Sequence, residues 1–195
     1  GDSQIGFAYT WAKNISDNGS DRSNAPQNAY DIKSERARAT FDRRQVFNVN
    51  GVYMLPFFKK QQGIVGKTLG GWQSSVIFYA MTGLPLRATT AALDPGAIGI
   101  IPSAAAARPD RICDPNAGAP QTRFQYFNTG CFAKVPDGQF RPGNSGTYII
   151  DGPGFTKFDL SLSKNVIFKE RFRFQLRGEA TNAFNHSNPS GVGTA

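Results

Sequence analysis

The sequence predicts an all-β protein in which antiparallel, up-and-down strands form part of a transmembrane β-barrel. Five segments alternate between apolar and polar side chains, as strands with two different faces do. No amphipathic helical pattern is present to cover the apolar faces. The connections alternate between long and short, which is typical of barrels with long external loops and short periplasmic turns. Apolar solvent on one side of the strands and water on the other would explain this pattern.

The first two strands are expected over residues 4–13 and 44–55, and Pro56 ends the second. One face of the first strand carries four large side chains: Ile5, Phe7, Tyr9 and Trp11. Its other face carries small or polar residues. In the second strand, aromatic and aliphatic residues share one face with Gly51, whereas Asn48, Asn50 and Val52 share the other. Both strands therefore fit a wall between lipid and water.

The remaining strands are expected over 72–90, 156–167 and 171–185. The fourth strand alternates most regularly, and a short connection leads from it to the fifth. One continuous apolar surface is expected from Phe158, Leu160, Leu162, Phe172, Phe174 and Leu176. The opposite, wetted face is expected to carry Asp159, Lys164, Arg171, Arg173 and Arg177.

Two long loops, 14–40 and 91–154, separate these strands, and a basic, glycine-containing turn covers 57–71. The whole of 1–195 is interpreted as one partial barrel segment, because five strands are fewer than the roughly eight that the smallest transmembrane barrel needs. No signal peptide is recognisable and the chain begins with Gly, so a processed or excised segment is expected.

Charge and cysteine usage narrow the classes of partner. The net charge is +8, but Lys and Arg are scattered without a run of five, so no nucleic-acid partner is expected. No apolar window is long enough for a transmembrane helix. Cys113 and Cys131 lack the spacing of a zinc site, which leaves either two free thiols or, as the favoured alternative, a loop disulfide in an oxidising compartment. The weakly calcium-like stretch 17–21 lacks the bidentate Glu, so no metal is predicted.

Enzymatic activity and cofactors are not expected. The one histidine, His186, would have to serve any Ser–His or Cys–His site, including one with Cys131. Ser145 does not lie in a G-x-S-x-G motif. Asp110 and Asp114 are interpreted as solvated loop charges. Neither a phosphate-cradling loop nor a dinucleotide fingerprint is present.

Several blocks together resemble the C-terminal barrel of TonB-dependent outer-membrane receptors, of the Oar-like type found in Acidobacteria-like bacteria. The most specific blocks, in this order, are Gly152-Pro153-Gly154-Phe155, Asp159-Leu160-Ser161-Leu162-Ser163-Lys164, and Arg177-Gly178-Glu179-Ala180 followed by Phe184-Asn185-His186. Weaker blocks are Ala8-Tyr9-Thr10-Trp11-Ala12-Lys13, Phe41-Asp42-Arg43-Arg44, Gly70-Gly71-Trp72, Thr82-Gly83-Leu84-Pro85, Arg108-Pro109-Asp110, Phe127-Asn128, Cys131-Phe132 and Arg141-Pro142-Gly143-Asn144.

This resemblance implies a barrel of about 22 strands with an N-terminal plug, located in the bacterial outer membrane. It implies that the partners are outer-membrane lipid, the rest of the barrel and plug, and the TonB system acting through the plug. The sequence contains no residues that match a plug or TonB box, so the chain is expected to be a fragment that contributes wall strands and ligand-facing loops.

The larger loop is basic, and its candidate ligand residues are Arg108, Arg111, Arg123 and Arg141. They would favour an anionic ligand by electrostatic steering. Alternatively, these arginines pair only with Asp110, Asp114 and Asp137. Two other classes of function stay open at this point, a soluble secreted β-sandwich that acts as a binding module and a small hydrolase.

Overall fold

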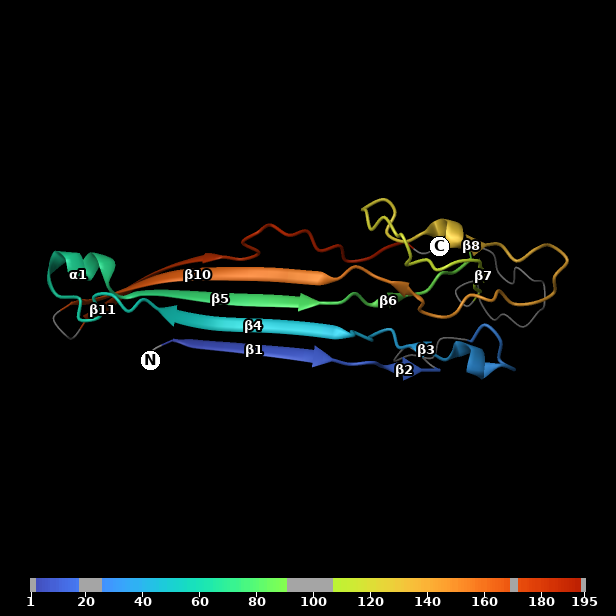
Figure 1. Ribbon diagram of the computed structural model, residues 1–195, viewed down its shortest axis with the longest axis horizontal. Coiled ribbons are helices and arrows are strands. Elements are labelled where there is room, and N and C mark those ends of the chain that lie inside the picture. Colours follow the sequence, from blue (N-terminus) through green and yellow to red (C-terminus); the bar gives the residue numbers. More distant parts are fainter. Residues whose placement is uncertain (1–2, 18–25, 91–106, 169–171, 194–195) are drawn as a thin grey trace. The chain divides into compact units, whose positions relative to one another are not determined.

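The computed structural model describes residues 3–17, 26–90, 107–168 and 172–193 (Figure 1). These residues form two compact units. The sheet unit comprises the segments up to Thr10, Val46–Met81 and Phe155–Asn188, and the loop unit comprises Trp11–Gln45, Thr82–Gly154 and the segment from Pro189. The chain passes between the units near the end of β1, the start of β4, the end of β5 and the start of β10, and again between Asn188 and Pro189.

The sheet unit contains a five-stranded sheet in the order β1-β4-β5-β10-β11. Its strands are β1 Gln4–Trp11, β4 Gln45–Met54, β5 Trp72–Met81, β10 Phe155–Phe168 and β11 Phe172–Ala180. Each long strand pairs with the next long strand of the chain, and neighbouring arrows point in opposite directions (Figure 1). The predicted all-β, antiparallel, up-and-down fold class is therefore confirmed.

Aromatic side chains follow one row across the middle of this sheet. Phe158 of β10 pairs with Phe78 of β5, which pairs with Val49 of β4, and directly paired residues share a face. The Phe78 ring lies 6.0 Å from the Phe158 ring and 5.9 Å from the Phe47 ring, measured between centroids. The Phe184 ring, in the turn after β11, lies 4.8 Å from that of Phe158. These contacts favour the observed register, because a slip of one residue would move every aromatic ring to the other face.

The first two strands end within two residues of their predicted bounds, but the third and fifth are much shorter than the sequence pattern predicts. The strand expected over 72–90 ends at Met81, and the chain then enters a separate two-stranded sheet of β6 Pro85–Leu86 and β9 Ile150–Asp151. Between them, Gly83 approaches the backbone of Gly152 so closely that a Cβ atom would collide with it. The regular alternation breaks at this close approach, which local sequence does not reveal.

The fifth strand, expected over 171–185, ends at Ala180. Asn182 and Asn185 both have positive φ, and the Asn182 side chain bonds to the backbone of His186 in both directions. Asn tolerates this conformation and forms such turns, so the apolar spacing that continues to Phe184 belongs to a turn and not to a strand. Arg171 and the expected tight turn at 169–171 lie outside the described residues.

The segment 57–71, expected to be a turn, contains the helix α1 Gly63–Leu69. Its seven residues are too few for a helical sequence pattern to be evident, and two glycines weaken that pattern further. No helix in the described part of the chain has the length and apolarity to cross a membrane.

The loop unit is folded, although the sequence predicts only loops over 14–40 and 91–154. Within it, β2 Ile15–Ser16 pairs with β3 Ala37–Arg38, and β7 Asp110–Arg111 pairs with β8 Phe132–Ala133. Two short 3-10 helices, η1 Ile32–Glu35 and η2 Thr129–Cys131, complete it. Its small core consists of Ala88, Phe127 and Ile150, against which Leu86, Tyr126, Phe132, Ile149 and Val192 pack. These two-residue strands carry too little alternation to be predicted.

A disulfide joins Cys113 and Cys131, the pair for which a loop disulfide is expected, across 18 positions of the chain. Its removal by a Cys113→Ser, Cys131→Ser double substitution should destabilise the loop unit by about 3 kcal/mol in the chain-entropy model. Hydrogen exchange of the amides from Ile112 to Phe132 measures this loss, and amides of β5 serve as the internal control. Thiol titration of the denatured, non-reduced protein should detect no free thiol; two reactive thiols would contradict the pairing.

Candidate functional site

The five-stranded sheet has one apolar face, whose side chains are exposed on β1 and β11 and half-buried at Val49, Val76, Phe78 and Phe158 of the central strands. We call it the apolar face; the register of β4, β5, β10 and β11 assigns to it Phe47, Val49, Tyr53, Val76, Phe78, Phe158, Leu160, Leu162, Phe172, Phe174 and Leu176. A Cβ on Gly51, which shares this face, would contact Ile5, so Ile5, Phe7, Tyr9 and Trp11 of β1 lie on it as well. Phe7 is 79% exposed and Phe172 is 70% exposed. An apolar surface of this extent requires a cover, either protein or lipid.

The register confirms that Phe158, Leu160, Leu162, Phe172, Phe174 and Leu176 share this face. The prediction for Lys164 was wrong, because Lys164 pairs with Trp72 on one side and Leu176 on the other and so lies on the apolar face. The period of two along a strand requires this, since Lys164 follows Leu162 by two positions. Its ammonium group donates to the backbone carbonyls of Thr68 and Gly70 and lies over the Trp72 ring.

The opposite face, which we call the polar face, carries most of the hydrogen-bonding side chains of the sheet. Its members include Asn48, Asn50, Gln73, Ser75, Lys157, Asp159, Ser161, Asn165, Arg173, Gln175, Arg177 and Glu179. Asp159, Arg173 and Arg177 were predicted there. This face also carries some apolar residues: Val46, Val52, Met54, Ile77, Met81, Phe155 and Ile167. Ile77 is 53% exposed. A face of this composition suits contact with water or with a polar interior.

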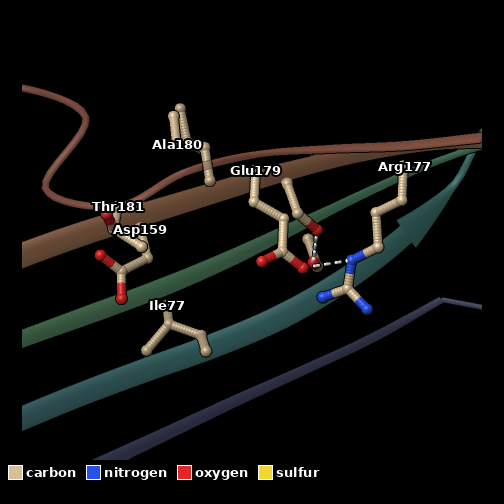
Figure 2. A pocket seen from close by; sticks show the side chains of 9 residues that line it. Ile77, Asp159, Arg177, Glu179, Ala180 and Thr181 are labelled. Carbon is tan, nitrogen blue, oxygen red and sulfur yellow. Dashed lines mark hydrogen bonds and ion pairs between the residues drawn. The ribbon is translucent and has the colours of Figure 1, made fainter.

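A shallow cavity of about 130 Å³ lies on the polar face between β5, β10 and β11 (Figure 2). Arg177 Nε lies 2.5 Å from Glu179 Oε1, and the hydroxyl groups of Ser75 and Ser161 lie 2.5 Å apart. Asp159 accepts from the Asn182 backbone N–H at 2.8 Å and pairs with Lys157 Nζ at 2.7 Å. Each charge thus has a partner of opposite sign, so the cavity is a neutralised polar surface and not a site poised for proton transfer.

Arg108, one of the four candidate ligand residues, is buried inside the loop unit and is 3% exposed. Its Nη1 group donates to Glu35 Oε2 at 2.7 Å and also to the Thr147 hydroxyl. The other Glu35 oxygen accepts from the backbone N–H of Gln27 at 3.0 Å. Burying an ion pair is costly unless its remaining groups are bonded, and these bonds meet most of that need. Arg108 therefore joins segments of the loop unit that lie far apart in the sequence.

Arg141 forms a two-pronged ion pair with Asp110, with N–O distances of 2.7 and 2.5 Å. The Asp110 carboxylate also accepts from the Asn144 backbone N–H at 2.9 Å. The hydrogen bond from Arg141 is the main cause that lowers the pKa of Asp110, against the opposing effect of burial, and the Asn144 bond adds to the lowering. The same pairing raises the pKa of Arg141.

Arg111 and Arg123 are exposed at the surface of the loop unit. The Arg111 Nε group donates to the Cys113 carbonyl at 2.8 Å, beside the disulfide. Of the three aspartates considered as partners, Asp110 holds Arg141, whereas Asp137 pairs with Lys134 and Asp114 accepts from the Asn116 backbone N–H. The structure thus brings Arg141 and Asp110 together, but leaves Arg111 and Arg123 facing solvent.

The residues weighed for catalysis are engaged in other interactions. Cys131 is disulfide-bonded and fully buried, so it offers no thiolate. Ser145 is buried, and the His186 backbone is tied to the Asn182 side chain. Within the described ranges, no cluster of His, Cys, Asp or Glu is suited to hold a metal ion. Most of the calcium-like stretch 17–21 lies outside those ranges.

The sequence did not reveal Gln27, Glu35 and Thr147 as partners of Arg108. Glu35 and Arg108 are separated by 73 positions, and both lie in segments without strand periodicity. The sequence showed only that Glu35 lies in one predicted loop and Arg108 in the other. A buried charge in a loop has no local signal, because its burial is created by segments distant in the chain.

The lowered pKa of Asp110 makes the loop unit sensitive to acid. A carboxylate whose folded pKa lies below its ordinary value of 3.8 stabilises fully above that value, and this contribution is lost as the pH falls through the lowered folded pKa. Hydrogen-exchange protection of the Asn144 amide, corrected for intrinsic rates, should therefore fall below about pH 4. An Asp110→Asn variant should be less protected at pH 6 and should lack this part of the acid dependence. Identical pH profiles for the two proteins would contradict the assignment.

The chain was also compared with known proteins. The family model for an outer membrane beta barrel domain matches residues 1–195. The comparison with curated proteins found no match. The comparison with solved structures found no match either. The family match covers the whole chain and agrees with the antiparallel sheet and its two unlike faces, and it establishes the bacterial outer membrane as the location. The chain belongs to the outer membrane beta barrel domain family.

Proposed function

We propose that this chain forms wall strands and external loops of a larger outer-membrane receptor barrel of the TonB-dependent type. The observation that carries the proposal is the division of five consecutive strands into one apolar face and one polar face. In a barrel wall the apolar face contacts lipid and the polar face lines the interior, with alternation along every strand. The strands contain 8 to 14 residues, which brackets the roughly 9 to 11 needed to cross the hydrocarbon layer.

The receptor in this proposal contains more wall than the described sheet. Five strands leave two edges, β1 and β11, whereas a transmembrane barrel needs about eight strands and has no open edge. Every residue of β11 is exposed. Further strands of the barrel would pair with these edges, a plug would occupy the interior, and the TonB system would act through that plug.

Connection lengths give the proposed orientation of the wall. The long segments after β1 and after β5 leave from the same end of the antiparallel sheet, and the shorter segments after β4 and β10 lie at the other end. Outer-membrane barrels place long loops outside the cell and short turns in the periplasm. The loop unit is then external, where loops on a rigid scaffold carry recognition.

Within the loop unit, we propose Arg111 and Arg123 as the surface contacts to an anionic ligand, with Arg141 held nearby by Asp110. Arg108 supports the loop architecture from its buried position. The disulfide and the Glu35–Arg108 pair keep the loop unit folded, which lowers the entropy cost of binding.

The alternatives have less support. A soluble sandwich would cover its apolar face with a second sheet, yet Phe7, Phe172 and Phe174 are exposed among the described residues. A structural or transport role fits the family better than catalysis, so we propose that the chain is not an enzyme.

Two substitutions of an aliphatic residue by Arg, one on each face, test which face of the sheet contacts lipid. Leu160 and Ile77 lie one register position apart at mid-sheet, Leu160 on the apolar face and Ile77 on the polar face beside Asp159. Leu160→Arg should cost about 2–4 kcal/mol if that face meets the centre of the bilayer. Ile77→Arg should be tolerated, because its charge meets water and a carboxylate.

The folded fraction of the full-length protein in outer membranes, measured as heat-modifiable gel mobility, reports the effect of each substitution. A strong loss for Leu160→Arg with near-normal assembly for Ile77→Arg supports the proposed wall. Equal losses, or a greater loss for Ile77→Arg, would contradict the assigned faces.

A further inference from the structure

The segment 57–71, between β4 and β5, exposes more apolar surface than a turn requires. Ile64 is 85% exposed, and Phe57, Phe58, Val65 and Leu69 are each more than half exposed. At 100° per residue, Ile64, Val65 and Leu69 of α1 fall within an arc of roughly 140°. Thr68 lies in the same arc, and its hydroxyl donates to the Ile64 carbonyl at 2.6 Å. The part of the helix at Gly66 is turned inward, since Gly66 is buried, whereas Gly63 is exposed. The helix is thus amphipathic, and its apolar side is directed outward.

Close packing holds this segment in one conformation. A Cβ on Gly66 would lie 2.9 Å from the carbonyl carbon of Gln61, so the helix rests directly on the preceding backbone. The Gln61 side chain donates to the Asn165 carbonyl at 2.8 Å and accepts from the Ile167 backbone N–H at 3.2 Å. Both partners belong to β10. The outward position of Ile64 and Val65 is therefore maintained by bonds to the wall.

The C-terminal end of α1 lies on the apolar face of the sheet. Lys164, which is on that face, donates from Nζ to the Thr68 carbonyl at 3.0 Å and also to the Gly70 carbonyl. Its Nζ lies 5.2 Å from the centroid of the Trp72 ring, and Trp72 Nε1 donates to the Thr68 carbonyl at 3.1 Å. Lys and Trp with these partners are typical of the level where hydrocarbon meets headgroups.

The charge of the segment has one sign. Lys59, Lys60 and Lys67 lie within 57–71, and that stretch contains no Asp or Glu. Amphipathic helices with lysines beside an exposed apolar side bind in the plane of anionic lipid surfaces. The end of the sheet that carries α1 is the end with short connections, which the proposed function places in the periplasm.

From these observations we infer that residues 57–71 form an interfacial anchor that lies in the headgroup layer of the periplasmic leaflet and binds anionic phospholipid. The apolar side chains of Phe57, Ile64 and Val65 enter the acyl boundary, and Lys60 meets the phosphates. The anchor fixes the height of the wall in the membrane. This inference rests on the proposed function, because it needs the apolar face to meet lipid.

Fluorescent labels at three positions test the anchor and the wall separately. The described cysteines form a disulfide, so Ile64→Cys, Leu162→Cys and Phe124→Cys each provide one reactive thiol for an environment-sensitive label in the full chain. Ile64 reports the anchor, Leu162 the middle of the wall, and Phe124, exposed in the loop unit, the aqueous control. The full-length barrel that contains this chain is reconstituted into vesicles of phosphatidylethanolamine with phosphatidylglycerol, and a water-soluble quencher and spin-labelled lipids of two depths are added.

The label at position 64 should be shielded from the aqueous quencher and quenched most by headgroup-level spin labels. The label at position 162 should be quenched most by mid-bilayer spin labels, and the label at 124 should stay accessible to water. A shielded label at 162 with an accessible label at 64 would contradict the interfacial anchor but would still support the lipid-facing wall. Accessible labels at both positions would overturn the proposed function and the anchor with it.

Charge dependence tests the lipid class. Each Lys near an anionic surface changes binding by about fivefold, so Lys60→Gln should lower the ratio of shielded to accessible label at position 64 by about that factor. Lys134→Gln, at an exposed lysine of the loop unit, should leave the ratio unchanged. Equal shielding of position 64 in phosphatidylcholine vesicles would overturn the assignment to anionic lipid. Shielding in detergent that depends on protein concentration would also overturn it, and would identify another copy of the chain as the partner.

Discussion

Backbone hydrogen bonding between adjacent strands is the constraint on which the sheet unit depends. Inside hydrocarbon, every N–H and C=O group must find a partner within the protein, because no water is available. The continuous antiparallel register of β4, β5 and β10 meets this need, and it places paired side chains on the same face. The apolar face and the polar face therefore follow from one register. A single-residue slip between two strands would put Asp159 beside aromatic rings and would expose Phe158 to the interior.

The two ends of the strands differ because different interactions stabilise them. At the end with short connections, Lys164, Trp72 and Gln61 fix α1 to the wall through carbonyl groups and a ring. The segments that leave from the other end form the loop unit, in which a disulfide, the buried Glu35–Arg108 pair and the Asp110–Arg141 pair replace the large core that two-residue strands cannot build. Charges that would be costly in lipid thus serve to order the loop unit.

Local sequence predicted the long strands well where alternation was uninterrupted, as in Phe158 to Ser163. It failed for Lys164, whose place follows from the period of two but whose charge suggested water. It also failed beyond Met81 and Ala180, where a close backbone approach at Gly83 and positive φ at Asn182 end the strands. The partners of Arg108 were not predictable, because contacts between loops more than 70 positions apart leave no periodic trace.

The central claim is that β10 is a wall strand with lipid on one side and an aqueous interior on the other. Spin labels placed singly at positions 157 to 163, in the membrane-embedded protein, test it most directly. Collision with oxygen, which partitions into lipid, should peak at 158, 160 and 162, and collision with a water-soluble nickel chelate should peak at 157, 159, 161 and 163. Two profiles with a period of two and opposite phase support the account. High access of the nickel chelate at all seven positions, or profiles without alternation, would contradict it.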